Sequence, residues 1–157
     1  MLAVNFHGYT RNTLDVDFVV ATERFDAVRD TMVAAGFTNI TTGENVVFFN
    51  APGSSLRVDF LRVDGGTMLG LLGNAIHANV QGCGVKVAAL RDLLAMKIFA
   101  LSQDVPRRMG KDLPDIANLV VLNNLDFETD IRPLCDRFGT PEACDLIRSH
   151  VEVLRKS

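Results

Sequence analysis

A strand pattern near the N-terminus contains two carboxylates, and this combination constrains the fold more than any other feature of the sequence. Asp15 and Asp17 alternate with three apolar residues, Leu14, Val16 and Phe18. Because successive side chains of a strand point to opposite faces, the two aspartates share one face. Adjacent carboxylates on a buried strand repel each other and lose hydration unless a cation lies between them. Two interpretations stay open: an oxygen-ligand site for Mg²⁺ or Mn²⁺, and two aspartates at a solvated strand end.

A second strand pattern, over residues 56–63, contains a third carboxylate in alternation with apolar residues, Asp59. If the two strands are neighbours, Asp59 can converge with Asp15 and Asp17 at one edge of a sheet. Three converging carboxylates are typical of the divalent-metal sites used for phosphoryl or nucleotidyl transfer. In such a site two aspartates bridge the ions that hold the triphosphate. The third ligates the ion that lowers the pKa of the attacking hydroxyl, and it can accept the proton of that hydroxyl.

Composition limits the function classes that the chain can serve. A length of 157 residues fits one domain with a hydrophobic core, and 48% hydrophobic with 22% charged residues is an ordinary globular composition. The net charge of -3 excludes an overall basic field for nucleic acid. Contact with RNA or with a nucleotide must therefore rely on a local basic patch or on a metal ion.

Cysteine usage and hydropathy predict the compartment. Cys83, Cys135 and Cys144 have no spacing typical of metal ligands or redox motifs, so free thiols in a reducing cytoplasm are the simplest account. No apolar run is long enough to span a membrane, and residues 1–8 lack the basic region of a signal peptide. We therefore expect a cytoplasmic protein without a membrane partner.

Hydrophobic periodicity predicts one α/β (α+β) domain over residues 1–157, sheet-rich over residues 1–88 and helical over residues 89–157. The expected strands cover residues 14–20, 37–41, 46–50, 56–63, 76–80 and 85–87. One expected helix ends at Phe6. The others cover residues 23–35, 68–72, 89–103, 112–123, 129–138 and 141–155. The expected N-caps of three of these helices are Thr22, Asp112 and Thr140.

Lys97 interrupts the apolar stripe of the strongest predicted helix, which covers residues 89–103. The stripe consists of Leu90, Leu94, Ile98 and Leu101. Lys97 is interpreted either as a triphosphate contact or as a lysine at the helix edge whose ammonium reaches water. The cost of burying an unpaired ammonium favours the functional role. Met96 and Phe99 cover the opposite side, so we expect this helix to be enclosed on both faces.

The loop after this helix is basic, because it contains Arg107, Arg108 and Lys111. These side chains are candidates for triphosphate contacts, since charge must be neutralised where it develops. An ordinary solvated turn accounts for them as well, and the two interpretations stay open. Asp112, the next residue, is expected to cap a helix, a role that does not exclude a place in the site.

Four ordered motifs lie between residue 1 and about residue 122. They are Arg11-x-Thr13-x-Asp15-x-Asp17, Val58-Asp59-Phe60, Leu90-x-x-Leu93-Leu94-x-x-Lys97-x-x-Ala100 and Asp112-x-x-Asp115. Together they resemble the motifs of the AbiEii-type nucleotidyltransferases, which belong to the DNA polymerase beta nucleotidyltransferase superfamily. The resemblance implies a mixed sheet flanked by helices and transfer of a nucleoside monophosphate from an NTP, dependent on Mg²⁺ or Mn²⁺. The acceptor would be a hydroxyl of RNA (tRNA included), of a protein or of a small molecule.

The resemblance also assigns roles to residues and partners. The implied metal ligands are Asp15, Asp17 and Asp59. The implied nucleotide-binding residues are Arg11, Thr13, Lys97, Asp112 and Asp115, with Lys97 on the phosphates and also counted among the catalytic residues. Many family members are toxins of bacterial toxin–antitoxin or phage-defence pairs, which implies an antitoxin as a partner. The alternative is a catalytically degenerate module on the same fold that binds a nucleotide or a partner.

One departure from the family pattern concerns the start of the chain. The family begins with a strand and then Gly-Gly or Gly-Ser at a helix N-terminus, where backbone N–H groups hold phosphate. Counting back from Ala3-Val4-x-x-His7-Gly8, Met1 lies where the second glycine is expected. Either the start codon is wrongly placed, or the chain is a truncated, inactive member. Because unpaired strand edges and exposed apolar patches are usually covered by another chain, we expect a two-fold homodimer.

Overall fold

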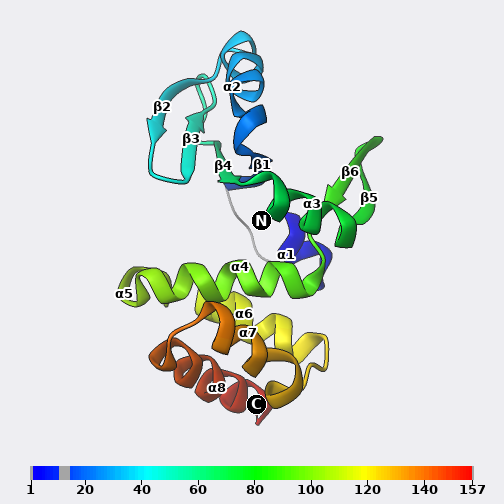
Figure 1. Ribbon diagram of the computed structural model, residues 1–157, viewed down its shortest axis with the longest axis vertical. Helices are drawn as coiled ribbons and strands as arrows, with labels where there is room; N and C mark the ends of the chain where they lie inside the picture. The colour runs from blue at the N-terminus through cyan, green and yellow to red at the C-terminus, as the bar shows by residue number, and fades with distance from the viewer. Residues whose placement is uncertain (1, 11–14, 157) are drawn as a thin grey trace. The chain divides into compact units, whose positions relative to one another are not determined.

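The computed structural model describes residues 2–10 and 15–156 (Figure 1). The chain clusters into two compact units. We call residues 15–86 the sheet unit, and residues 3–10 with 87–156 the helical unit. Among the described residues, no helix is long and apolar enough to cross a membrane.

The sheet unit contains a four-stranded mixed sheet, which confirms the predicted α/β class. Its strands are β1 (Asp15–Ala21), β2 (Thr38–Thr42), β3 (Val46–Asn50) and β4 (Arg57–Val63), in the order β1-β4-β3-β2. β1 and β4 are parallel, whereas β3 is antiparallel to both of its neighbours. Parallel neighbours need a crossover connection. Here η1 (Thr22–Arg24), α2 (Phe25–Ala34) and the β2–β3 hairpin provide it.

Aromatic packing between α2 and the sheet forms the core of this unit. Phe25 of α2 lies against Phe49 and Phe60 of the sheet, with ring centroids 6.4 and 6.3 Å away. Val28 and Met32 of the same helix pack on this core, as their spacing predicts. The predicted cap is wrong, because the hydroxyl of Thr22 donates to the carbonyl of Val63 instead of capping the helix.

β1 is less buried than its apolar pattern suggests. Only Val20 is buried, and Asp17 and Phe18 are exposed. The ring of Phe18 is 48% exposed and stacks on Phe60 at 5.4 Å. The strand has this exposure because β1 lies at an end of the sheet and pairs with β4 alone among the described strands. Leu14, the expected first residue of the strand, lies outside the described residues.

The glycine-rich segment after β4 forms a helix and a hairpin. α3 (Gly65–Asn74) is longer than expected, and Asp64 caps it by accepting from the N–H of Thr67. β5 (Ile76–Val80) and β6 (Cys83–Val87) then pair as a separate two-stranded sheet. The turn between them has φ of 51° at Gln81 and 86° at Gly82, the positive values that a tight hairpin turn requires.

The helical unit confirms the predicted helical C-terminal half. Its helices are α1 (Leu2–Phe6), α4 (Leu90–Gln103), α5 (Val105–Arg108), α6 (Asp112–Leu122), η2 (Phe127–Ile131), α7 (Arg132–Phe138) and α8 (Pro141–Arg155). The side chain of Asn123 donates to the carbonyl of His7, and a ring nitrogen of His7 lies 2.8 Å from the carbonyl of Ala88. These contacts hold the short N-terminal helix within the unit.

In the helical unit, one predicted helix cap is confirmed, and two other predictions about helices are wrong. Thr140 caps α8 as predicted, because its hydroxyl accepts from the N–H of Ala143. Asp112 is not a cap but the first residue of α6, after Lys111 at the cap position. α4 is not enclosed on both faces, since Phe99 is 52% exposed.

Two valines near the C-terminal end of α8 allow a matched test of core packing. Val151 is 1% exposed and Val153 is 62% exposed on the same helix. We expect Val151→Ala to lower the free energy of unfolding by about 2 kcal/mol, because two methyl groups leave a packed site. Val153→Ala should change it by less than about 0.5 kcal/mol. Urea denaturation of both variants measures the difference, and equal losses would contradict this placement of α8.

Candidate functional site

The parallel pairing of β1 with β4 brings the three predicted metal ligands to one face of the sheet. Asp15 lies opposite Arg57, and Asp17 lies opposite Asp59. Side chains at paired positions of neighbouring strands share a face. We call these four residues the carboxylate–arginine cluster.

Arg57 occupies the position where a cation would balance the carboxylates. Its Nε donates to Oδ1 of Asp59 at 2.7 Å, and its Nη2 donates to Oδ2 of the same carboxylate at 2.9 Å. Nη2 also lies 3.4 Å from Oδ2 of Asp15. The guanidinium stacks 4.9 Å above the ring of Phe48, which belongs to β3 and fixes its orientation.

The electrostatics of the cluster centre on Asp59, whose side chain is 11% exposed. Burial raises the pKa of the Asp59 carboxyl, the hydrogen bond and charge of Arg57 oppose that shift, and the charges of Asp17 and Asp15 add to it. The hydrogen bond to Asp59 likewise raises the pKa of Arg57. Asp59 is therefore a carboxylate that binds a proton more readily than an exposed one.

The cluster matches a divalent cation in donor chemistry but not in its present arrangement. Carboxylate oxygens are the ligands that Mg²⁺ and Mn²⁺ prefer. Within the described part of the chain, however, no three histidine, cysteine or acidic side chains are placed to hold a metal ion. Arg57 contacts two of the three carboxylates. The oxygens of Asp15, Asp17 and Asp59 can hold an ion only after the guanidinium moves aside.

A second charged cluster lies in the helical unit. Nζ of Lys97, on α4, lies 3.0 Å from Oδ1 of Asp112 and 2.7 Å from Oδ2 of Asp115, both on α6. Arg108 of α5 reaches the other oxygen of Asp112 at 3.1 Å. We call these four residues the lysine–aspartate cluster. Lys97 and the two aspartates are buried.

The lysine–aspartate cluster changes the physical account of Lys97. The residue is 7% exposed, so its ammonium does not reach water along the helix edge. Two carboxylates compensate its charge, so the ammonium is not left unpaired. The cluster joins α4 to α6 through ion pairs, and a nucleotide-binding role for Lys97 stays a prediction.

Of the predicted site residues, the structure gathers Asp15, Asp17 and Asp59 on one sheet face and Lys97, Asp112 and Asp115 in a separate cluster. One residue of the first cluster was not predicted, and two predicted residues are not described. The missed residue is Arg57, although it stands two positions before Asp59 on the same strand face. That spacing was the available signal. Arg108 was expected either on a triphosphate or in a solvated turn, and it pairs with Asp112. Arg11 and Thr13 lie outside the described residues.

Comparisons with known proteins show a similarity at the level of structure and not of sequence. No family profile matches the chain, and no curated protein matches it in sequence. The chain is similar to the crystal structure of an antigenic nucleotidyltransferase-like protein from Paracoccidioides brasiliensis, with a TM-score of 0.49 and 18% identity. The match covers 93% of this chain and 80% of that one. The narrower AbiEii-type resemblance stays a prediction.

The buried ion pairs predict a large effect of removing Lys97. Lys97→Met leaves two buried carboxylates without their central cation, so we expect the free energy of unfolding to fall by roughly 3 to 5 kcal/mol. Adding Asp112→Asn and Asp115→Asn should restore much of that loss, because no buried charge then remains. Arg108→Met, at a half-exposed pair, should cost less than about 1 kcal/mol. Chemical denaturation of the three variants measures these losses. An unchanged free energy of unfolding in Lys97→Met would contradict a structural role for the cluster.

The raised pKa of Asp59 predicts a pH-dependent variant. Because burial disfavours the ionised carboxylate, that form destabilises the fold at neutral pH, and the penalty is relieved as pH falls through the folded-state pKa toward the ordinary value of 3.8. Asp59→Asn should therefore be as stable as the parent at pH 7 or more stable, by up to about 1 kcal/mol. The difference in the free energy of unfolding between variant and parent should vanish at pH values below 3.8.

The measurement is the free energy of unfolding of parent and variant across that pH range. Asp26→Asn, an exposed aspartate of α2, is the matched control. A clear loss of stability in Asp59→Asn at pH 7 would mean that the pair with Arg57 outweighs the cost of burial.

Proposed function

We propose that this protein is a metal-dependent nucleotidyltransferase that transfers a nucleoside monophosphate from an NTP to a hydroxyl. The observation that carries the proposal is the parallel register of β1 and β4, which gives Asp15, Asp17 and Asp59 a common face. Carboxylates gathered from two neighbouring strands are suited to hold hard divalent cations. The four-motif resemblance supports the same reaction class.

In this proposal each carboxylate has a distinct task. Asp15 and Asp17, from one strand, offer oxygens for Mg²⁺ or Mn²⁺. Asp59 has a raised pKa, which suits it to receive the proton of the attacking hydroxyl as that oxygen bonds to the α-phosphorus and pyrophosphate leaves. A divalent ion held by these groups would lower the pKa of the hydroxyl and neutralise charge on the phosphates. Arg57 must leave the carboxylates first, and its guanidinium then becomes available to a phosphate.

The remaining assignments of the resemblance enter the proposal as further roles. Lys97 would contact the phosphates, and Arg11, Thr13, Asp112 and Asp115 would contribute to nucleotide binding. RNA such as tRNA, a protein and a small molecule are the acceptor classes, and an antitoxin would be the protein partner of a bacterial toxin. The free thiols suit a reducing cytoplasm.

Arg57 favours a second candidate function. A guanidinium that already balances Asp15 and Asp59 is a permanent substitute for a metal ion if it cannot be displaced. The protein would then be a catalytically degenerate module that binds a nucleotide or a protein partner. The two candidates differ in whether a divalent cation competes with Arg57 for the carboxylates.

Calorimetric titration with Mn²⁺ tests the proposal, with and without a non-hydrolysable NTP analogue. We expect weak Mn²⁺ binding by the parent that tightens at least about tenfold with the analogue, because phosphate oxygens complete the coordination shell. The double variant with Asp15→Asn and Asp17→Asn should lose Mn²⁺ binding. Asp26→Asn with Asp30→Asn, two exposed aspartates of α2, should leave it unchanged.

Arg57→Gln supplies the discriminating arm of this titration. Under the transferase proposal it should bind Mn²⁺ more tightly than the parent, because a competing cation is removed, and the parent should transfer label from an α-labelled NTP. Mn²⁺ binding by Arg57→Gln but not by the parent would support the degenerate module. If Mn²⁺ binding persists in the double variant with Asp15→Asn and Asp17→Asn, these carboxylates do not hold the ion. That result would exclude their use in either candidate function.

A further inference from the structure

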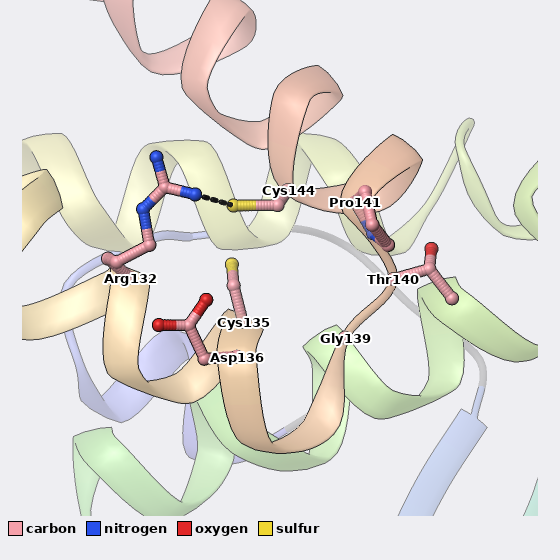
Figure 2. A pocket seen from close by; sticks show the side chains of 7 residues that line it. All are labelled: Arg132, Cys135, Asp136, Gly139, Thr140, Pro141 and Cys144. Carbon is pink, nitrogen blue, oxygen red and sulfur yellow. Dashed lines mark hydrogen bonds between the residues drawn. The ribbon is translucent and has the colours of Figure 1, made fainter.

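A pocket between α7 and α8 contains two cysteines (Figure 2). Its volume is about 260 Å³, and its lining includes the side chains of Arg132, Cys135 and Cys144. Figure 2 shows both sulfur atoms directed toward the same space, one from each helix. Both cysteines are free thiols, and they are 3% and 4% exposed. A small molecule that enters this pocket meets both sulfurs.

A tightly packed turn joins the helices that carry the two cysteines. Gly139 lies between the helices, where an added Cβ would stand 2.8 Å from the carbonyl oxygen of Cys135. A side chain at this position would collide with the last turn of α7 and with Ile98 of α4. Cys144 lies in the first turn of α8, and its N–H bonds to the carbonyl of Thr140. The two cysteines, one on each helix, therefore line the same pocket.

The two sulfurs have different electrostatic surroundings. Nη1 of Arg132 donates to Sγ of Cys144 at 3.6 Å, and the charge of Cys144 is the largest cause of the raised pKa of Arg132. Burial and the contact with Cys144 raise the pKa of Cys135 to about 12. The raised pKa keeps the proton on Cys135, whereas the sulfur of Cys144 accepts a hydrogen bond from a guanidinium. Thiolate beside a cation is the reactive form of cysteine.

We propose that Cys135 and Cys144 form a peroxide-sensitive pair, in which Cys144 is oxidised first and Cys135 then closes a disulfide. The Cys144 thiolate attacks one oxygen of hydrogen peroxide, the O–O bond breaks, and hydroxide leaves. Cys144 is then a sulfenic acid, oxidised by two electrons. The sulfur of Cys135 displaces the hydroxyl of that sulfenic acid, and the proton of the thiol and the departing hydroxyl form water.

The surroundings of these two sulfurs differ from those of a cysteine that only fills space in a core. A cysteine that only fills space needs neither a guanidinium on its sulfur nor a second sulfur facing the same pocket. Both features occur here, together with a pocket that admits an oxidant. The resulting bond would tie α7 to α8 across the turn at residues 139–140.

Peroxide treatment of the Cys83→Ser chain tests the proposal, because that change removes the exposed thiol. We expect a mass loss of two hydrogens and a single linked peptide pair containing Cys135 and Cys144. Adding Cys135→Ser should trap a sulfenic acid on Cys144 that dimedone labels. Adding Cys144→Ser instead should leave Cys135 unlabelled. Arg132→Gln should slow oxidation by about tenfold, and Arg132→Lys should restore part of the rate.

Two results would overturn the proposal. One is that dimedone labels Cys135 before it labels Cys144. The other is a pair that stays reduced in the folded Cys83→Ser chain at peroxide concentrations that oxidise the same chain in urea. Peptide mapping over time in that chain gives the order of oxidation without a further substitution, so the result stands even if a serine variant fails to fold.

Discussion

A charge removed from water must have a partner of opposite sign, and this constraint organises both units of the protein. In the helical unit it joins Lys97 to Asp112 and Asp115. In the sheet unit it draws Arg57 onto Asp59 and Asp15. The desolvation of an isolated ion in an apolar interior costs several kcal/mol. The lysine–aspartate cluster is therefore a condition for the packing of the apolar residues around it, whereas Arg57 offsets only part of the cost of burying Asp59.

The two clusters satisfy this constraint with different consequences. The lysine–aspartate cluster is closed, because buried carboxylates surround the ammonium and α4 and α6 cannot separate without exposing it. The carboxylate–arginine cluster is open to solvent on the side of Asp17. The side chain of Arg57 is half-exposed, so its guanidinium can exchange a carboxylate for a phosphate at low cost, because water screens the charges while they are apart. The open cluster is thus better suited to ligand exchange, and the closed one to holding helices together.

The thiol pair depends on packing rather than on charge alone. Gly139 permits a tight turn after α7, and the helix that follows places Cys144 against Arg132 in a pocket shared with Cys135. A sulfur next to a guanidinium and a second sulfur becomes chemically distinct from a cysteine that only fills space. The exposed Cys83, which stands on β6 in another environment, has none of these neighbours in the described contacts.

Local sequence patterns determined much of this protein. Alternation placed Asp15, Asp17 and Asp59 on strands, apolar periodicity identified α4 and α8, and Thr140 marked the start of α8. These signals suffice because strand and helix periods act between residues close in the chain. Only the tertiary structure decided that β1 pairs with β4 and that Arg57 holds the place of a cation. It also decided that Lys97 has two carboxylate partners and that Cys135 meets Cys144. Pairing, burial and pKa values depend on which distant groups come into contact, and a one-dimensional pattern does not specify those contacts.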